Sequence, residues 1–232
     1  MKQAIGRSCD LDVDHREKTA FVSAQDGGLV NQGKMDVLRL EVRVGIHSRA
    51  QADSEGIVWS EVAIDKQSSH PDYENCTSRF MNDLAVLTLK ESLEWNDHVS
   101  PVCLAKAPLN RNRAHECYVT GWGRTIPDVS YSDSDVLRQA TVNVLQDKYC
   151  DDEARPDQFC AGNIAGDTNP WGIQDACKGD SGGPLVCHMG GGQFEQFGVV
   201  SWGDGCAKIG HPGWYANVTH FAEWIDTMIN LN

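Results

Sequence analysis

Apolar residues recur along the chain in short runs that turn-rich segments separate. Between Leu38 and Val44 every second residue is apolar, Arg and Glu occupy the positions between, and Gly45 follows. This two-residue period indicates a strand with one buried face. Similar runs follow at 84–89, 117–121, 136–145, 184–187 and 198–202. With 22 glycines between and around them, these short strands predict an all-β barrel or sandwich.

The two ends of the chain depart from this pattern. Near the C-terminus, apolar residues fall at helical spacing and predict one helix that packs back onto a barrel: Phe221, Trp224, Ile225, Met228 and Ile229. Residues 1–37 carry many charges without a clear period, and we describe them as an irregular or altered N-terminal segment.

Composition excludes some classes of function. A chain of 232 residues with 41% hydrophobic content can bury one large β-rich core. Its net charge of -13 argues against a nucleic-acid partner, which needs clustered Lys and Arg. No stretch is apolar enough to span a membrane, and we expect no membrane partner.

Nine cysteines without a C-x-x-C pair predict disulfides and an extracellular, secreted protein. Residues 1–14 nevertheless lack the apolar stretch of a signal peptide. We therefore expect that this start is not the natural one, or that an upstream segment is missing. An odd number of cysteines leaves at least one thiol free or intermolecular.

The segment from Asp175 to Cys187 reads D-A-C-K-G-D-S-G-G-P-L-V-C. A serine hydroxyl is a weak nucleophile until a tight turn holds it near a base and near donors for the developing oxyanion. Glycines on both sides of Ser181 allow such a turn and a close approach of a substrate carbonyl. The alternative interpretation is a glycine-rich turn that merely joins two strands.

This segment resembles the chymotrypsin and trypsin family of serine proteases, and the resemblance covers about residues 38–232. Further motifs that resemble the family lie at 82–85 (NDLA), 101–104 (PVCL), 117–123 (CYVTGWG), 159–162 (FCAG), 201–203 (SWG) and 212–215 (PGWY). The resemblance implies two antiparallel six-stranded β-barrels with a C-terminal helix, the first barrel being incomplete. The protease domain would then comprise residues 38–232.

The resemblance also implies roles for individual residues. Ser181 matches the nucleophile, and the backbone N–H groups of Gly179 and Ser181 match the oxyanion hole. Asp83 matches the acid that orients the catalytic histidine. Asp180 matches the acid that receives the new N-terminal amine when a zymogen is cleaved. No cofactor is implied.

Asp175, six residues before Ser181, matches the base of the specificity pocket in trypsin-like members. A carboxylate there favours Arg or Lys, so the expected partners are protein or peptide substrates with a basic residue before the cleaved bond. Protease inhibitors are a further class of partner. Gly203 and Gly213 match the pocket walls, and the segment Ser201, Trp202 and Gly203 matches the one that pairs with the substrate backbone.

By the same resemblance, six cysteines form the pairs Cys117–Cys187, Cys150–Cys160 and Cys177–Cys206. Cys9, Cys76 and Cys103 have no assigned partners, although Cys103 resembles a position that ties the domain to a cleaved upstream segment. No metal site is predicted. Asp53 and Glu55 lie in a loop that binds calcium in some relatives, but Ile46 stands where the first ligand would be.

The general base is missing from its expected place. In the family it lies in a Thr-Ala-Ala-His-Cys-like segment, and the nearest match here begins F-V-S-A at Phe21, with Gln25, Asp26 and Gly27 in place of Ala-His-Cys. His15 is the one histidine of the N-terminal segment, whereas His70 resembles a surface turn. The Ile-Val-Gly-Gly-like start of an activated protease is missing too.

Two hypotheses of function follow. The first is a trypsin-like serine endopeptidase domain, an incomplete or variant chain that is inactive as given. The second is a non-catalytic protease homologue that acts as a binding or regulatory protein. Retention of Asp83, Asp175 and Ser181 favours the first, because binding alone does not need all three. A metal-binding domain is a third class with little support.

Overall fold

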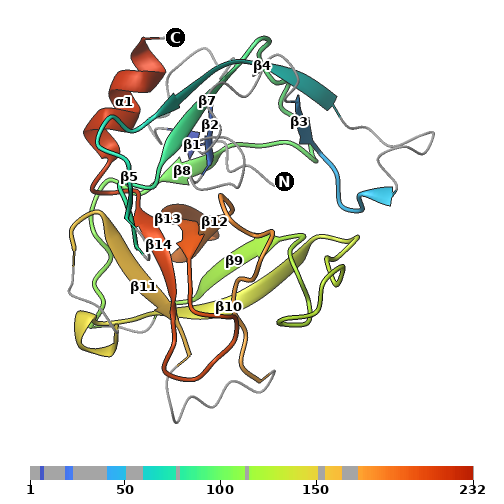
Figure 1. The fold of residues 1–232 in the computed structure, drawn as a ribbon. Helices are drawn as coiled ribbons and strands as arrows, with labels where there is room; N and C mark the ends of the chain where they lie inside the picture. The colour runs from blue at the N-terminus through green and yellow to red at the C-terminus, as the bar shows by residue number, and fades with distance from the viewer. Residues whose placement is uncertain are drawn as a thin grey trace.

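The computed structural model describes residues 6–7, 19–22, 41–50, 60–76, 79–112, 115–150, 155–163 and 172–231. These residues form mostly β-structure with one α-helix (Figure 1). The elements of the first half are β1 (Gly6–Arg7), β2 (Thr19–Val22), β3 (Glu41–Val44), β4 (Ser60–Ser69), β5 (Glu74–Cys76), β6 (Arg79–Met81), β7 (Ala85–Leu89) and β8 (Val102–Leu104). Those of the second half are β9 (Cys117–Gly121), β10 (Arg138–Val144), the 3₁₀ turn η3 (Asp147–Tyr149), β11 (Gln158–Gly162), β12 (Pro184–Gly190), β13 (Gln193–Trp202), β14 (Gly213–Asn217) and α1 (Ala222–Asn230).

The second half of the chain closes into a six-stranded antiparallel barrel. Its strands follow the order β13-β12-β9-β10-β11-β14, and the pairing of β14 with β13 closes the ring. Strand β8 adds to β13 in parallel, and β1 adds to β8. Closure leaves no free edge within the ring.

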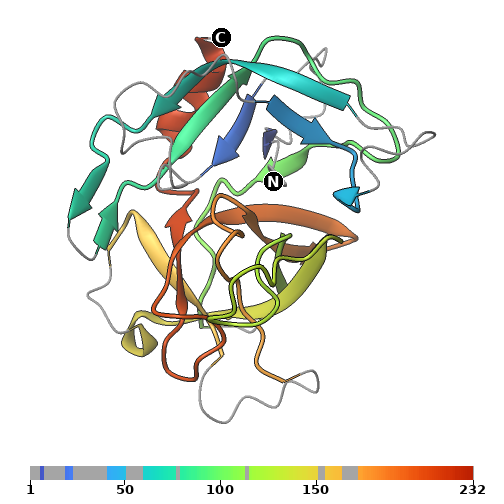
Figure 2. The ribbon, with the colours of Figure 1, turned by 45° about the vertical axis from the view of Figure 1, so that its right-hand side comes forward.

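A second sheet has the order β2-β7-β4-β3, and β5 and β6 form a separate hairpin. Figures 1 and 2 show this sheet on one side of the barrel, with α1 beside it. The predicted all-β fold of two barrels, the first incomplete, with a C-terminal helix is confirmed in the form of one closed six-stranded barrel, a second sheet and one C-terminal helix. Strands β1 and β2 lie within residues 1–37, and they pair with β8 and β7, far along the chain. The domain division at residue 38 stays a prediction.

A shared apolar cluster joins the sheet to the barrel. Leu84 and Val86 of the sheet side pack with Val199 of β13, while Phe221 and Ile225 bring in the helix. The helix begins after Phe221, as its apolar stripe predicts. Burial of such side chains stabilises by roughly 1.5–3 kcal/mol each, so this cluster fixes the sheet against the barrel.

Three predicted disulfides are confirmed: Cys117–Cys187, Cys150–Cys160 and Cys177–Cys206. Cys103, which the sequence left without a partner, is disulfide-bonded as well. The residues Asp53 and Glu55 lie outside the described part of the chain. Within that part, no helix has both the length and the apolar content that a membrane crossing requires.

Candidate active site

Ser181 lies at the tip of a tight turn before β12. The backbone N–H of Gly183 donates to the carbonyl of Asp180 at 2.9 Å, and Gly182 donates to Val200 of β13 at 2.9 Å. A Cβ atom at Gly183 would lie 2.7 Å from the Asp180 carbonyl oxygen, so this position needs glycine. The turn therefore presents the Ser181 side chain from a backbone that is anchored to the barrel.

Two backbone N–H groups flank the turn. Gly179 has a φ of 95°, in the left-handed region that favours glycine. Neither its N–H nor that of Ser181 donates to an acceptor among the described residues. Both donors are thus available to an oxygen of a bound molecule, which is what an oxyanion hole requires.

Asp83 lies directly before β7, where the sheet meets the barrel. Its residue is 0% exposed, and Ser201 Oγ donates to its Oδ2 at 2.5 Å. Burial, followed by the charge of Asp83, raises the pKa of the Tyr73 hydroxyl. The sequence had placed Ser201 beside the substrate backbone and missed that its hydroxyl binds Asp83.

A pocket of about 400 Å³ contains both Ser181 and Asp175. Its lining includes the other residues predicted for the specificity pocket: Ser201, Trp202, Gly203 and Gly213. A Cβ at Gly213 would lie 3.4 Å from Asp175 Oδ1 and 3.4 Å from Tyr215 Cε2, so glycine keeps space beside the carboxylate. The structure thus brings these sequence-predicted residues together.

Asp175 is held by the backbone of the pocket. Its carboxylate accepts N–H groups from Ala176 at 2.8 Å and from Ala207 at 2.9 Å. Burial nevertheless dominates and raises the pKa of Asp175 to about 6, against the opposing effect of those two hydrogen bonds. A cation that entered the pocket would compensate for the lost hydration of the carboxylate and stabilise its ionised form.

Asp180 occupies a separate niche against β9. It accepts the N–H of Gly123 at 2.8 Å and that of Cys177 at 2.9 Å. A Cβ at Gly121 would lie 2.0 Å from Asp180 Oδ1, so the glycines of the G-W-G motif make room for this side chain. Burial raises the pKa of Asp180. No cation pairs with it among the described side chains.

Behind this niche lies a second cavity of about 290 Å³. Asp175 and Asp180 both line it, together with Gly121, Gly123 and Ile173. Arg124 and Arg138 line the cavity as well, so charged groups of both signs border it.

The histidines of the described residues make contacts elsewhere. His70 packs against Phe221 and Trp224, with ring centroids 5.2 and 5.0 Å apart, and burial lowers its pKa. Among the described residues, no hydrogen bond or ion pair joins a histidine to Ser181. His15 lies outside those residues.

Sequence patterns missed several residues of the Asp175 pocket, among them Phe80 and Tyr215. Phe80, from β6, lines it together with Trp202. Tyr215 lines it from β14, fully buried, with no hydrogen-bond partner for its hydroxyl among the described residues. The P-G-W-Y motif signalled Tyr215, whereas nothing in the local sequence signalled Phe80.

Comparison with known proteins identifies related sequences. The family model described as Trypsin covers residues 30–225. Transmembrane protease serine 5 of Homo sapiens is 40% identical over 149 residues, 62% of this chain and 31% of that protein. Urokinase-type plasminogen activator of Gallus gallus is 35% identical over 172 residues, 72% of this chain and 39% of that protein.

Trypsin II-P29 of Gallus gallus is 33% identical over 197 residues, which are 82% of this chain and 71% of that protein. The chain spans less than half the length of the first two relatives and more than two thirds of the third. Together with the matching family model, this similarity shows that the chain belongs to the trypsin family of serine proteases.

Proposed function

We propose that this chain is a trypsin-like serine endopeptidase domain that is specific for Arg and Lys before the cleaved bond. The observation that carries the proposal is the single pocket that contains both Ser181 and the buried carboxylate of Asp175. A basic side chain that pairs with Asp175 would bring the next carbonyl of the substrate toward Ser181. Proteases of this family act on protein substrates, and protein inhibitors that present a basic residue would bind the same pocket.

The proposed mechanism is acyl transfer. Ser181 Oγ attacks the carbonyl carbon, and the N–H groups of Gly179 and Ser181 stabilise the oxyanion that forms. The leaving amine departs to give an acyl-enzyme, which water then hydrolyses. With a histidine supplied, Asp83, held by Ser201, would orient the imidazole that carries the proton from Ser181 to the amine.

As the chain stands, we infer that turnover is blocked at two points. No recognisable histidine occupies the family's base position, and loss of this group costs on the order of a million-fold in turnover in a comparable triad. The sequence also lacks the Ile-Val-Gly-Gly-like motif of the family, whose N-terminal amine would pair with Asp180. Leaving a buried carboxylate without its partner costs about 3–5 kcal/mol, which disfavours the active arrangement of the turn.

The missing base also favours a second candidate function. A non-catalytic homologue could bind basic peptides in the same pocket without cleaving them. The three disulfides are typical of an oxidising compartment, and both candidates agree with an extracellular location.

Labelling with a fluorophosphonate probe tests the proposed block. We expect the chain to react no faster than Ser181→Ala, because no group removes the proton from Ser181. The measurement is covalent labelling followed over time by mass spectrometry. Rapid labelling that is lost in Ser181→Ala would contradict the block and exclude the non-catalytic candidate.

The affinity for benzamidine, a small aromatic cation, should depend on pH. Because burial raises the pKa of Asp175 to about 6 in the empty pocket, the carboxyl is protonated below that pH and must lose its proton to pair. We expect the association constant to be level above pH 6 and to fall about tenfold per unit below it. Calorimetry between pH 4.5 and 8 measures this, and a pH-independent affinity contradicts the role of Asp175.

A further inference from the structure

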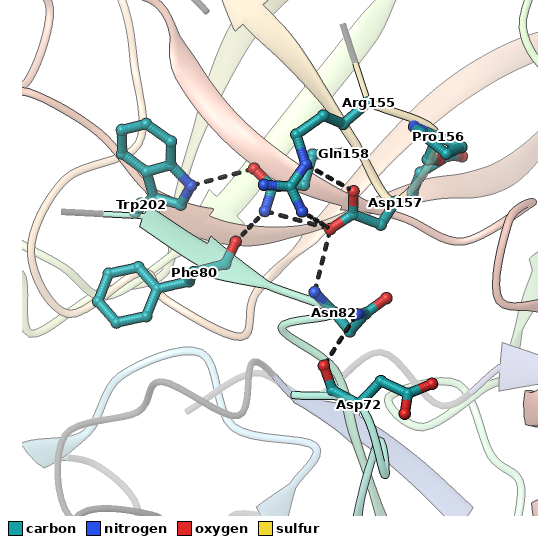
Figure 3. A network of polar contacts seen from close by, with 9 residues as sticks. Asp72, Phe80, Asn82, Arg155, Pro156, Asp157, Gln158 and Trp202 are labelled. Carbon is teal, nitrogen blue, oxygen red and sulfur yellow. Dashed lines mark hydrogen bonds and ion pairs between the residues drawn. The ribbon is translucent and has the colours of Figure 1, made fainter. Parts of the chain in front are cut away.

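A buried glutamine makes hydrogen bonds to Phe80 and Trp202, two of the aromatic residues that line the Asp175 pocket. Gln158 in β11 is 4% exposed, and its Oε1 accepts the indole N–H of Trp202 at 3.2 Å. Its Nε2 donates to the carbonyl of Phe80, and also to Asp157 Oδ2 at 3.5 Å. Figure 3 shows Gln158 at the centre of this network, with both rings directed to the same side.

The partners of Gln158 require a carboxamide of this length. The Trp202 indole can only donate, whereas the Phe80 carbonyl and the Asp157 carboxylate can only accept. A side chain between them must therefore accept on one side and donate on the other. Methionine has the same length but does neither well, and asparagine is one methylene too short to reach both.

Asp157 anchors the same network to the loop before Asp83. Arg155 donates to both of its carboxylate oxygens at 3.2 Å, and the backbone N–H of Asn82 donates to Oδ2 at 3.0 Å. Asn82 has a φ of 50°, and its side chain donates to the carbonyl of Asp72 at 2.9 Å. Buried networks in which every member is satisfied hold their parts rigidly.

The two rings come from different parts of the fold. Phe80 belongs to the β5–β6 hairpin and Trp202 to the end of barrel strand β13, yet both line the pocket of Ser181 and Asp175. A substrate backbone that pairs with residues 201–203 as an added strand would run past Trp202. Its residues before the basic one would then lie between Trp202 and Phe80.

We propose that Gln158 is a positioning residue that sets the gap between Phe80 and Trp202, and so selects the substrate residues that precede the basic one. This inference rests on the proposed function. Because the gap is lined by two rings, the side chain that it favours is apolar and flat, an aromatic one above all.

The test uses three ligands that bind without covalent chemistry. Benzamidine reaches only the Asp175 pocket, whereas acetyl-Phe-Gly-4-amidinobenzylamide and acetyl-Gly-Gly-4-amidinobenzylamide extend into the gap. Calorimetry on the full chain gives the ratio of affinities for the last two ligands. We expect the phenylalanine ligand to be preferred, and expect Gln158→Met to lower that preference about fivefold, the effect of one hydrogen bond, while benzamidine affinity stays within about twofold.

Gln196→Met is the matched control, because Gln196 is a fully buried glutamine of the same barrel that does not line the pocket. It should leave the ratio unchanged. If Gln158→Met does not fold, Gln158→Asn provides the same test with a carboxamide that is too short. An unchanged ratio in a folded Gln158 variant, or no preference in the parent chain, overturns the inference. Failure of the parent chain to bind benzamidine overturns the proposed function instead.

Discussion

Asp26→His is expected to raise the rate of fluorophosphonate labelling and of arginyl-peptide hydrolysis by about a thousand-fold or more, when a peptide beginning Ile-Val is also supplied. The antiparallel register pairs Val22 of β2 with Ala85 of β7, so the C-terminal end of β2 lies at the end of β7 that follows Asp83. Asp26 itself lies outside the described residues, but it stands at the histidine position of the family motif. A base there contributes up to a million-fold in turnover in a comparable triad.

The peptide is needed because no amine pairs with Asp180 among the described residues, and the 290 Å³ cavity beside Asp180 has room for a small apolar residue. Gln25→His places the same imidazole one residue away and should gain little. Ser181→Ala in the Asp26→His background should abolish both signals. If Asp26→His reacts no faster than Gln25→His, the catalytic proposal fails and the non-catalytic homologue becomes the better interpretation.

Asp175→Ser is expected to weaken benzamidine binding about 100-fold or more at pH 7.5. The amidinium would then be buried without its carboxylate, and loss of one partner of a buried charge pair costs about 2–5 kcal/mol. Asp204→Ser is the matched control, because it removes one negative charge from an exposed side chain that faces Lys208 and His211. Calorimetry measures both variants. Equal losses of benzamidine affinity in the two variants would mean that the net negative charge of the protein, and not the pocket, attracts the ligand.

Local patterns predicted the elements whose signal lies within a few residues. Strands β7, β9 and β12 and the helix α1 followed from short apolar runs, and the G-D-S-G-G-P segment identified the nucleophile turn. Strand β2 was missed because its stability comes from β7, more than 60 residues later, and not from its own composition. Long β4 was missed as well, since Val62 and Ile64 are its only two buried residues.

The residues of the site also divide into those that a local motif predicts and those that only contacts across the fold bring together. Asp175 and Ser181 could be predicted because they share one motif with fixed spacing. Contacts across the fold could not, because no sequence period links Gln158 to Phe80, 78 residues earlier, or Ser201 to Asp83, 118 residues earlier. Such pairs arise only when the sheet and the barrel pack together.

The closed barrel has a consequence for the order of folding. Its pairs β9–β10, β12–β13 and β13–β14 join strands that are neighbours along the chain, so each loop that must close is short. The pairing of β2 with β7 must instead close a loop of more than 60 residues. Closing the ring through β12 and β9 spans a similar length, because Leu185 pairs with Val119. Contacts of short sequence separation form faster, so these hairpins are able to form first and serve as the template on which the ring closes and the N-terminal sheet then forms.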